Sequence, residues 1–125
     1  MTKSISDNKF ILSPHEEGFY DLFIKDNVEI FIDDMERIKA AQKELSGNRI
    51  PILIDGGKYS TTNIDVMRYI AKNENMPYSK VSAYIAKSTS QKLLGNFYMK
   101  MNKPERPTRF FSTRADAIEW IRQYL

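Results

Sequence analysis

The chain has 125 residues, which fits one domain, and its 42% apolar and 28% charged residues are ordinary globular usage that argues against disorder. It contains no cysteine, which excludes disulfides, thiolate metal sites and thiol nucleophiles, and no apolar run approaches the length of a membrane span or of a signal peptide core, so a cytoplasmic location is expected. The net charge of +3 is unevenly distributed along the chain. Residues 1–36 contain nine acids and three bases, and residues 76–114 contain eight bases and one acid. The acidic first segment argues against a dedicated nucleic-acid binder.

A β-hairpin is expected at residues 9–24. Short apolar runs at 9–13 and 19–24 flank the turn residues 14–18. In the second run Tyr20, Leu22 and Ile24 alternate with side chains of the opposite face, so one face should meet the core. A further short extended piece is expected at 28–31.

Residues 33–45 are expected to be helical, because apolar side chains recur there at spacings of three and four, and residues 46–48 end the helix. The continuous apolar run at 50–54 predicts a strand that is covered on both faces and is central and parallel. A helix with Thr62 or Asn63 as its N-cap follows.

The remaining segments repeat the strand and helix alternation. A strand is expected at 81–86, and Ser88 with Gln91 forms a capping-box pattern that opens the next helix. Residues 108–111 predict a last strand, and Thr113 caps a final helix. The sequence thus predicts an α/β domain spanning residues 1–125, of order ββαβαβαβα, with a mixed sheet and helices packed on it.

Candidate chemistry is sparse. His15 lies in the hairpin turn without a catalytic partner, and no Asp, Glu and His spacing matches a metal-ligand set. The run Gly56, Gly57 and Lys58 lies where a phosphate loop would be, but its spacing does not match that motif, which favours a structural turn. We therefore expect no catalytic residue, no metal and no cofactor.

Two clusters have more than one interpretation. Ser60, Thr61 and Thr62 precede a helix start, where a phosphate would meet free backbone amides, although hydroxyl residues also gather there as caps. Residues 96–108 mix aromatic and basic side chains, which is typical of a nucleic-acid or anionic-lipid surface and equally of a core-facing helix with a basic outer side. Five methionines could line a pocket for an apolar ligand or fill gaps in a core: Met35, Met67, Met76, Met99 and Met101.

Two segments resemble a known superfamily. The run from Ile52 to Asp55, followed by a polar loop and a helix from about Ile64, resembles the strand, loop and helix of STAS domains, the anti-sigma-factor antagonist fold. The C-terminal portion resembles small bacterial proteins of the SpoIIAA-like or STAS/SEC14 class in these residues: Asn96, Phe97, Tyr98, Met99, Lys100, Lys103, Pro104, Pro107, Thr108, Phe110, Phe111, Ala117 and Trp120. The similarity covers nearly the whole chain in order.

The resemblance implies a SpoIIAA-like fold and the binding of partner proteins, nucleotides or apolar ligands rather than turnover. It also implies a switch, because the antagonists are phosphorylated on a serine at the start of the second helix. Their Asp-Ser-Ser-Gly run is missing here. Thr61 or Thr62 would take the phosphate, or Asp65 would hold the position with a permanent charge.

Three functional hypotheses follow, with an enzyme the least favoured. The first is a non-enzymatic regulatory module that binds a protein partner, with pairing of two copies as a further option because of the charge division. Its expected site is Asp55, Ser60, Thr61, Thr62 and Asp65. The second is a carrier of a small apolar or lipid-like molecule, held between the sheet and the helix at 93–101. The residues expected to meet an anionic head group are Lys100, Lys103, Arg106 and Arg109.

Overall fold

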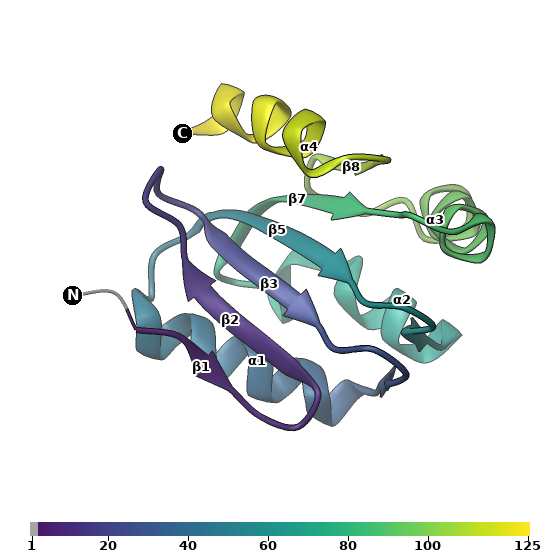
Figure 1. Cartoon of the computed structure of the whole chain (residues 1–125), viewed down its shortest axis with the longest axis horizontal. Coiled ribbons are helices and arrows are strands. Elements are labelled where there is room, and N and C mark those ends of the chain that lie inside the picture. Colours follow the sequence, from purple (N-terminus) through teal and green to yellow (C-terminus); the bar gives the residue numbers. More distant parts are fainter. Residues whose placement is uncertain (1–2) are drawn as a thin grey trace.

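The computed structural model describes residues 3–125 and has a six-stranded mixed sheet with helices on both faces (Figure 1). The strands in chain order are β1 (Ile5–Ser6), β2 (Phe10–Pro14), β3 (Tyr20–Ile24), β5 (Ile50–Gly56), β7 (Ser79–Ile85) and β8 (Thr108–Phe111). Their order in the sheet is β1-β2-β3-β5-β7-β8. The pairs β1–β2 and β2–β3 are antiparallel, and β3, β5, β7 and β8 run parallel.

The helices divide the core into two parts. They are α1 (Ile32–Leu45), α2 (Ile64–Ile70), α3 (Thr89–Asn102) and α4 (Arg114–Ile121), with 3-10 turns at Asn73–Asn75 and Arg122–Tyr124. Side chains of α1, α2 and α3 pack on one face of the sheet and form the larger core with residues such as Leu12, Leu22 and Ile52. On the other face α4 packs Ala117 and Trp120 against Leu53 and forms the smaller core.

The predicted order of the main elements is confirmed, and so are several local signals. In β3 the buried residues are Tyr20, Leu22 and Ile24, as the period of two predicted. β5 is paired on both sides by parallel strands, and Ile52 and Leu53 face opposite cores. The caps are also as expected, because Asn63, Ser88 and Thr113 each accept a backbone hydrogen bond at the start of a helix.

Three short strands were not predicted as such. β1 lies in the N-terminal segment, and a separate two-stranded parallel sheet joins β4 (Glu29–Ile30) to β6 (Thr61–Thr62). Only the extended character of residues 28–31 was expected. Two-residue strands carry no periodic pattern of their own, so their pairing depends on neighbours distant in sequence. Within residues 3–125, none of the helices has the length and apolar character needed to cross a bilayer.

Candidate functional site

The loops after β3, β5 and β7 meet at the edge formed by the carboxyl ends of the parallel strands. The Gly57 amide donates to the Ile24 carbonyl (2.8 Å), and the Lys58 amide donates to Asp26 Oδ1 (2.7 Å). From the other side the Gln91 side-chain amide donates to the Gly57 carbonyl (3.0 Å). Ligands of open α/β sheets bind beyond this end of the strands. We call this region the carboxyl edge and define it by residues 25–28, 55–65 and 86–91.

Gly57 is required by the packing of these loops. A Cβ at this position would lie 2.5 Å from both the Ile24 carbonyl oxygen and Asp26 Oδ1. Because one of those atoms belongs to the backbone, a side chain could be accommodated only by moving a strand end. The glycine run therefore acts as a structural turn, as the sequence indicated.

Tyr59 lies at the tip of the same loop in an unfavourable conformation. Its φ is 59°, in the left-handed region that bulky residues rarely adopt, and its side chain is 80% exposed. The Ser60 amide and hydroxyl both donate to the Gly57 carbonyl (3.1 and 2.7 Å), which holds the loop in this shape. Tyr59 was not identified from the sequence, where its signal is an aromatic residue in an otherwise polar, glycine-rich loop.

The three hydroxyl residues of the carboxyl edge differ in accessibility. Ser60 is half-buried and bonded as described above, and Thr62 Oγ1 donates to the Ile30 carbonyl (2.9 Å). Thr61 is exposed. Both threonines belong to β6, and Asn63 caps α2, so neither threonine is the helix cap.

The two predicted acids lie at different places on the edge. Asp55 is half-buried, and its Oδ1 lies 2.8 Å from Lys87 Nζ, which ties the end of β5 to the end of β7. Asp65 is exposed in the first turn of α2, 3.4 Å from an Nη of Arg68. The five predicted residues thus share one edge without converging on one point.

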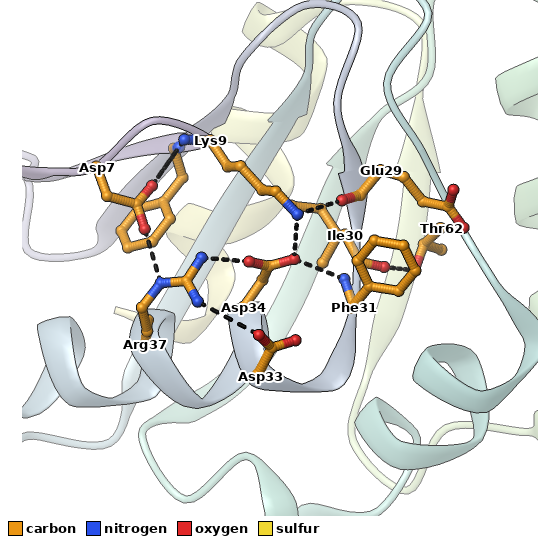
Figure 2. A network of polar contacts seen from close by, with 10 residues as sticks. Asp7, Lys9, Glu29, Ile30, Phe31, Asp33, Asp34, Arg37 and Thr62 are labelled. Carbon is orange, nitrogen blue, oxygen red and sulfur yellow. Dashed lines mark hydrogen bonds and ion pairs between the residues drawn. The ribbon is translucent and has the colours of Figure 1, made fainter.

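A buried carboxylate fixes the start of α1 beside this edge (Figure 2). Asp34 is 1% exposed, and its Oδ2 accepts hydrogen bonds from Lys9 Nζ and the Phe31 amide, both at 2.8 Å, while Oδ1 accepts from Arg37. Burial is the largest influence on the pKa of Asp34 and raises it, but these hydrogen bonds together hold the pKa below its ordinary value. The network therefore keeps Asp34 ionised and holds its carboxylate in one position.

A cavity of about 160 Å³ lies between the sheet and the helices α1, α2 and α3. Strands β3, β5 and β7 supply one wall, and Ile38, Met67 and Leu94 supply part of the other. Polar side chains line the cavity at the carboxyl edge: Ser60, Thr61, Thr62 and Gln91. The cavity occupies the place expected for an apolar ligand, between the sheet and the helix at 93–101.

The methionines separate into two groups. Met35, Met67 and Met76 line the cavity, as the sequence allowed. Met99 and Met101 are exposed on α3 and do not line it.

Three aromatic residues form one corner of the cavity. The rings of Tyr84 and Phe110 are stacked with centroids 4.7 Å apart, and Tyr98 meets both edge-on at 6.3 and 6.4 Å. Tyr98 is 3% exposed, and its hydroxyl is buried without a hydrogen-bond partner within residues 3–125. Burial, followed by the neighbouring Tyr84, raises the pKa of Tyr98, so the phenol stays neutral. Its role was not foreseen, because each of these rings comes from a different element.

A shallow groove beside the cavity separates the start of α2 from α3. Its lining is Thr62, Asn63, Ile64, Asp65, Met67, Leu94 and Phe97. Ile64 is 52% and Phe97 40% exposed. The groove therefore continues the carboxyl edge with apolar surface.

The four predicted anion-contacting residues do not lie together, which corrects the expected shared surface. Lys100 and Lys103 are exposed on α3 and at its end. Arg106 is 4% exposed and donates to the Ile70 carbonyl (2.6 Å) and Ser82 Oγ (2.9 Å), so its guanidinium is used inside the fold. Arg109 lies over the Phe111 ring at 5.2 Å, on the face of β8 opposite to Phe110.

The acidic N-terminal and basic C-terminal segments form ion pairs with each other within the chain. Arg114 pairs with Asp21, and Arg122 Nε lies 2.7 Å from Glu17 Oε1. Bases of the C-terminal part thus pair with acids of the hairpin. His15, in the hairpin turn, stacks on Phe19 with centroids 4.1 Å apart, and within residues 3–125 no three His, Asp or Glu side chains are grouped to hold a metal.

Comparison with known proteins supports the fold. Residues 16–125 match the family model described as a domain of unknown function, DUF7793. A crystal structure of an uncharacterised DUF3478 protein with a SpoIIAA-like fold, from Shewanella loihica PV-4, is similar to this chain with a TM-score of 0.55 and 14% identity, over 97% of this chain and 92% of that one. The fold is thus SpoIIAA-like, as the resemblance implied. No curated protein matches in sequence.

Proposed function

We propose that this chain, which belongs to the DUF7793 family, is a non-enzymatic STAS-type module that binds a protein partner through its carboxyl edge. The observation that carries the proposal is Tyr59, an aromatic side chain that is 80% exposed and has a φ of 59°. A left-handed conformation at a non-glycine residue costs on the order of 1–3 kcal/mol. The chain's own packing gains little from so exposed a ring, which supports a use outside the chain.

The surroundings of Tyr59 fit a protein interface. Tyrosine is enriched among residues that dominate binding energy, because it offers a rigid ring and a polar end. The groove beside the edge adds Ile64 and Phe97, whose exposed apolar surface would be buried by a partner. Asp55 and Asp65 contribute ion pairs to the same edge, with Lys87 and Arg68 respectively.

The proposal includes phosphorylation of Thr61 as a switch. Thr61 is exposed, and its hydroxyl makes only a long hydrogen bond of 3.4 Å to the Thr62 carbonyl. Ser60 and Thr62 are half-buried and donate to backbone carbonyls at 2.7 and 2.9 Å. A phosphate would add a charge of about −1.5 to −2 to the interface.

We also propose a cytoplasmic location and a bacterial regulatory role. A second copy of the chain is the alternative partner. Light scattering at low and high salt tests that alternative, since a monomer under both conditions contradicts it.

Site-specific photocrosslinking in the native host tests the interface. A photoreactive phenylalanine replaces Tyr59, and a matched control replaces Glu44, which is exposed near the end of α1. We expect a discrete adduct at position 59 that is absent at position 44 and is lost with Ile64→Lys. Equal adduct patterns at the two positions would contradict the proposal.

A second candidate function is carriage of a small apolar molecule, and the cavity is the specific observation that favours it. Its walls are mainly aliphatic, and its polar side chains lie at the carboxyl edge. Native mass spectrometry of protein purified from its host would show a bound small molecule. A clean apo mass together with no binding of apolar probes would remove this candidate.

A further inference from the structure

Helix α3 exposes a continuous row of apolar side chains. Leu93, Phe97 and Met101 follow one another at intervals of four residues and are 64%, 40% and 65% exposed. Residues four apart lie one above the other on a helix, so these three form one stripe along α3, with a length of about 12 Å. We call it the α3 stripe. Single exposed apolar residues are ordinary, but a continuous stripe indicates a binding surface.

The opposite side of α3 is the side that the fold uses. Gly95 and Tyr98 are the buried residues of this helix. Gly95 lets α3 approach the sheet closely, because a Cβ there would lie 2.7 Å from the ring of Phe110. Successive residues of a helix are turned by about 100°, which places Gly95 across the helix from Phe97. The α3 stripe is therefore not needed for packing α3 on the sheet.

The α3 stripe borders the shallow groove between α2 and α3. Leu94 and Phe97 line this groove from α3, and Ile64 and Met67 line it from α2. Phe97 thus belongs to both the stripe and the groove. Partner helices bind such grooves with an apolar side, whose anchoring residues are spaced by three and four positions. The shape of this surface fits a helix.

Basic side chains accompany the α3 stripe along one side. Lys92 and Lys100 each precede a stripe residue by one position, so they form the neighbouring row on the helix, and both are exposed. α3 contains no acidic residue. Across the groove, the exposed carboxylate of Asp65 lies 3.4 Å from an Nη of Arg68. The surface is therefore positive on the α3 side and close to neutral on the α2 side.

This uneven charge distinguishes between the possible occupants. Pairing α3 with α3 of a second copy would gather Lys92 and Lys100 of both copies without an acid from either helix, and like charges repel. An anionic bilayer would attract the lysines but would repel Asp65, which lines the groove beside Ile64. A helix of a partner protein carries its acids on one chosen side, so it can meet the lysines and avoid Asp65.

We propose that the partner protein inserts an amphipathic helix of about two to three turns into the groove between α2 and α3, with its apolar side on the α3 stripe and acidic residues facing Lys92 and Lys100. The inference rests on the proposed protein interface at the carboxyl edge and adds the chemistry of the partner. Tyr59 does not line the groove, so the two can be tested separately.

Photocrosslinking from the α3 stripe in the native host tests the nature of the occupant. A photoreactive phenylalanine replaces Phe97, and a matched control replaces Met99, an exposed apolar residue turned by about 200° from Phe97 on the same helix. Mass spectrometry then identifies the crosslinked peptide. We expect position 97, and not position 99, to capture a segment with helical apolar spacing and acids on one side. A captured segment without acids, a lipid, or this chain itself contradicts the inference.

Charge reversal tests the acidic side of the partner helix. Lys100→Glu is compared with Lys43→Glu, because both are exposed lysines in the last turn of a helix. With the photoreactive residue at position 97, Lys100→Glu should lower the adduct yield at least about threefold, and Lys43→Glu should leave it within about 1.5-fold. Lys100→Gln, which only removes the charge, should give an intermediate yield. Equal yields in all variants would overturn the assignment of acids to the partner.

The outcomes separate this inference from the proposed function. If position 59 gives an adduct with a protein and position 97 gives none, no helix lies in the groove, and the interface at Tyr59 stands. If neither position gives an adduct, the proposed function is contradicted, and this inference with it.

Discussion

Replacing Asp34 by asparagine tests whether the buried carboxylate organises the start of α1. The change keeps the shape of the side chain but removes the negative charge that Lys9, Arg37 and the Phe31 amide share. Hydrogen bonds to charged groups contribute about 1.5–3 kcal/mol each. The cost is reduced here, because the side chains of Lys9 and Arg37 are 23% and 44% exposed and can turn to water. We expect a loss of about 2 kcal/mol in the free energy of unfolding.

The stability lost in Asp34→Asn should also depend on pH. Because the pKa of Asp34 is lowered by folding, the stabilisation is fully present above the unfolded pKa of about 4 and disappears as the pH falls through the folded-state pKa. Urea unfolding of both proteins should therefore show a difference at about pH 7 that shrinks towards pH 3. Asp33→Asn is the control, since Asp33 shares the first helical turn but is 80% exposed, and it should change stability by about 0.5 kcal/mol or less. An Asp34→Asn loss that stays constant with pH, or that Asp33→Asn reproduces, would refute the reasoning.

Three further predictions concern packing and buried polar groups. Gly57→Ala should lower stability by about 1–3 kcal/mol in thermal unfolding, because its Cβ would lie 2.5 Å from Asp26 Oδ1 and a backbone carbonyl, and an unchanged melting temperature would contradict this close approach. Arg106→Met should cost about 2–3 kcal/mol by leaving the Ile70 carbonyl at the end of α2 without its donor, whereas Arg109→Met, at an exposed position, should cost less than about 0.5 kcal/mol. The free energy of unfolding should fall above about pH 10, because burial raises the pKa of Tyr20 in the folded state and ionisation of the phenol then favours unfolding. Tyr20→Phe should reduce this dependence of stability on pH. Identical pH dependence in the two proteins would count against the assignment to Tyr20.

Local signals in the sequence predicted the elements well because each depends on neighbouring residues. The alternation of Tyr20, Leu22 and Ile24 marked the core face of β3, and Ser88 with Gln91 marked the start of α3. The sequence did not predict that Thr61 and Thr62 form a strand, and the reason is that this strand depends on a distant segment. Their conformation is decided by pairing with β4, more than thirty residues earlier, and not by the helix they precede.

The candidate site could be predicted only in part. The loop at 55–65 was identified because turn residues, hydroxyls and acids follow a buried strand, and the structure places these residues on one edge. Arg106 could not be distinguished from Lys100 and Lys103 by composition, although its guanidinium is buried between α2 and β7. Tyr59 likewise gave no sign of its left-handed backbone, which depends on contacts around the loop.

The sequence by itself determined the α/β class, the order of the main strands and helices, and the caps of α3 and α4, because side-chain periodicity and capping act over a few residues. The tertiary structure alone decided that Tyr84, Tyr98 and Phe110 share one corner, that a cavity remains between the sheet and three helices, and which of the basic residues is buried. These features depend on how side chains from distant segments fill a common space, and that volume is set only when the whole chain has packed.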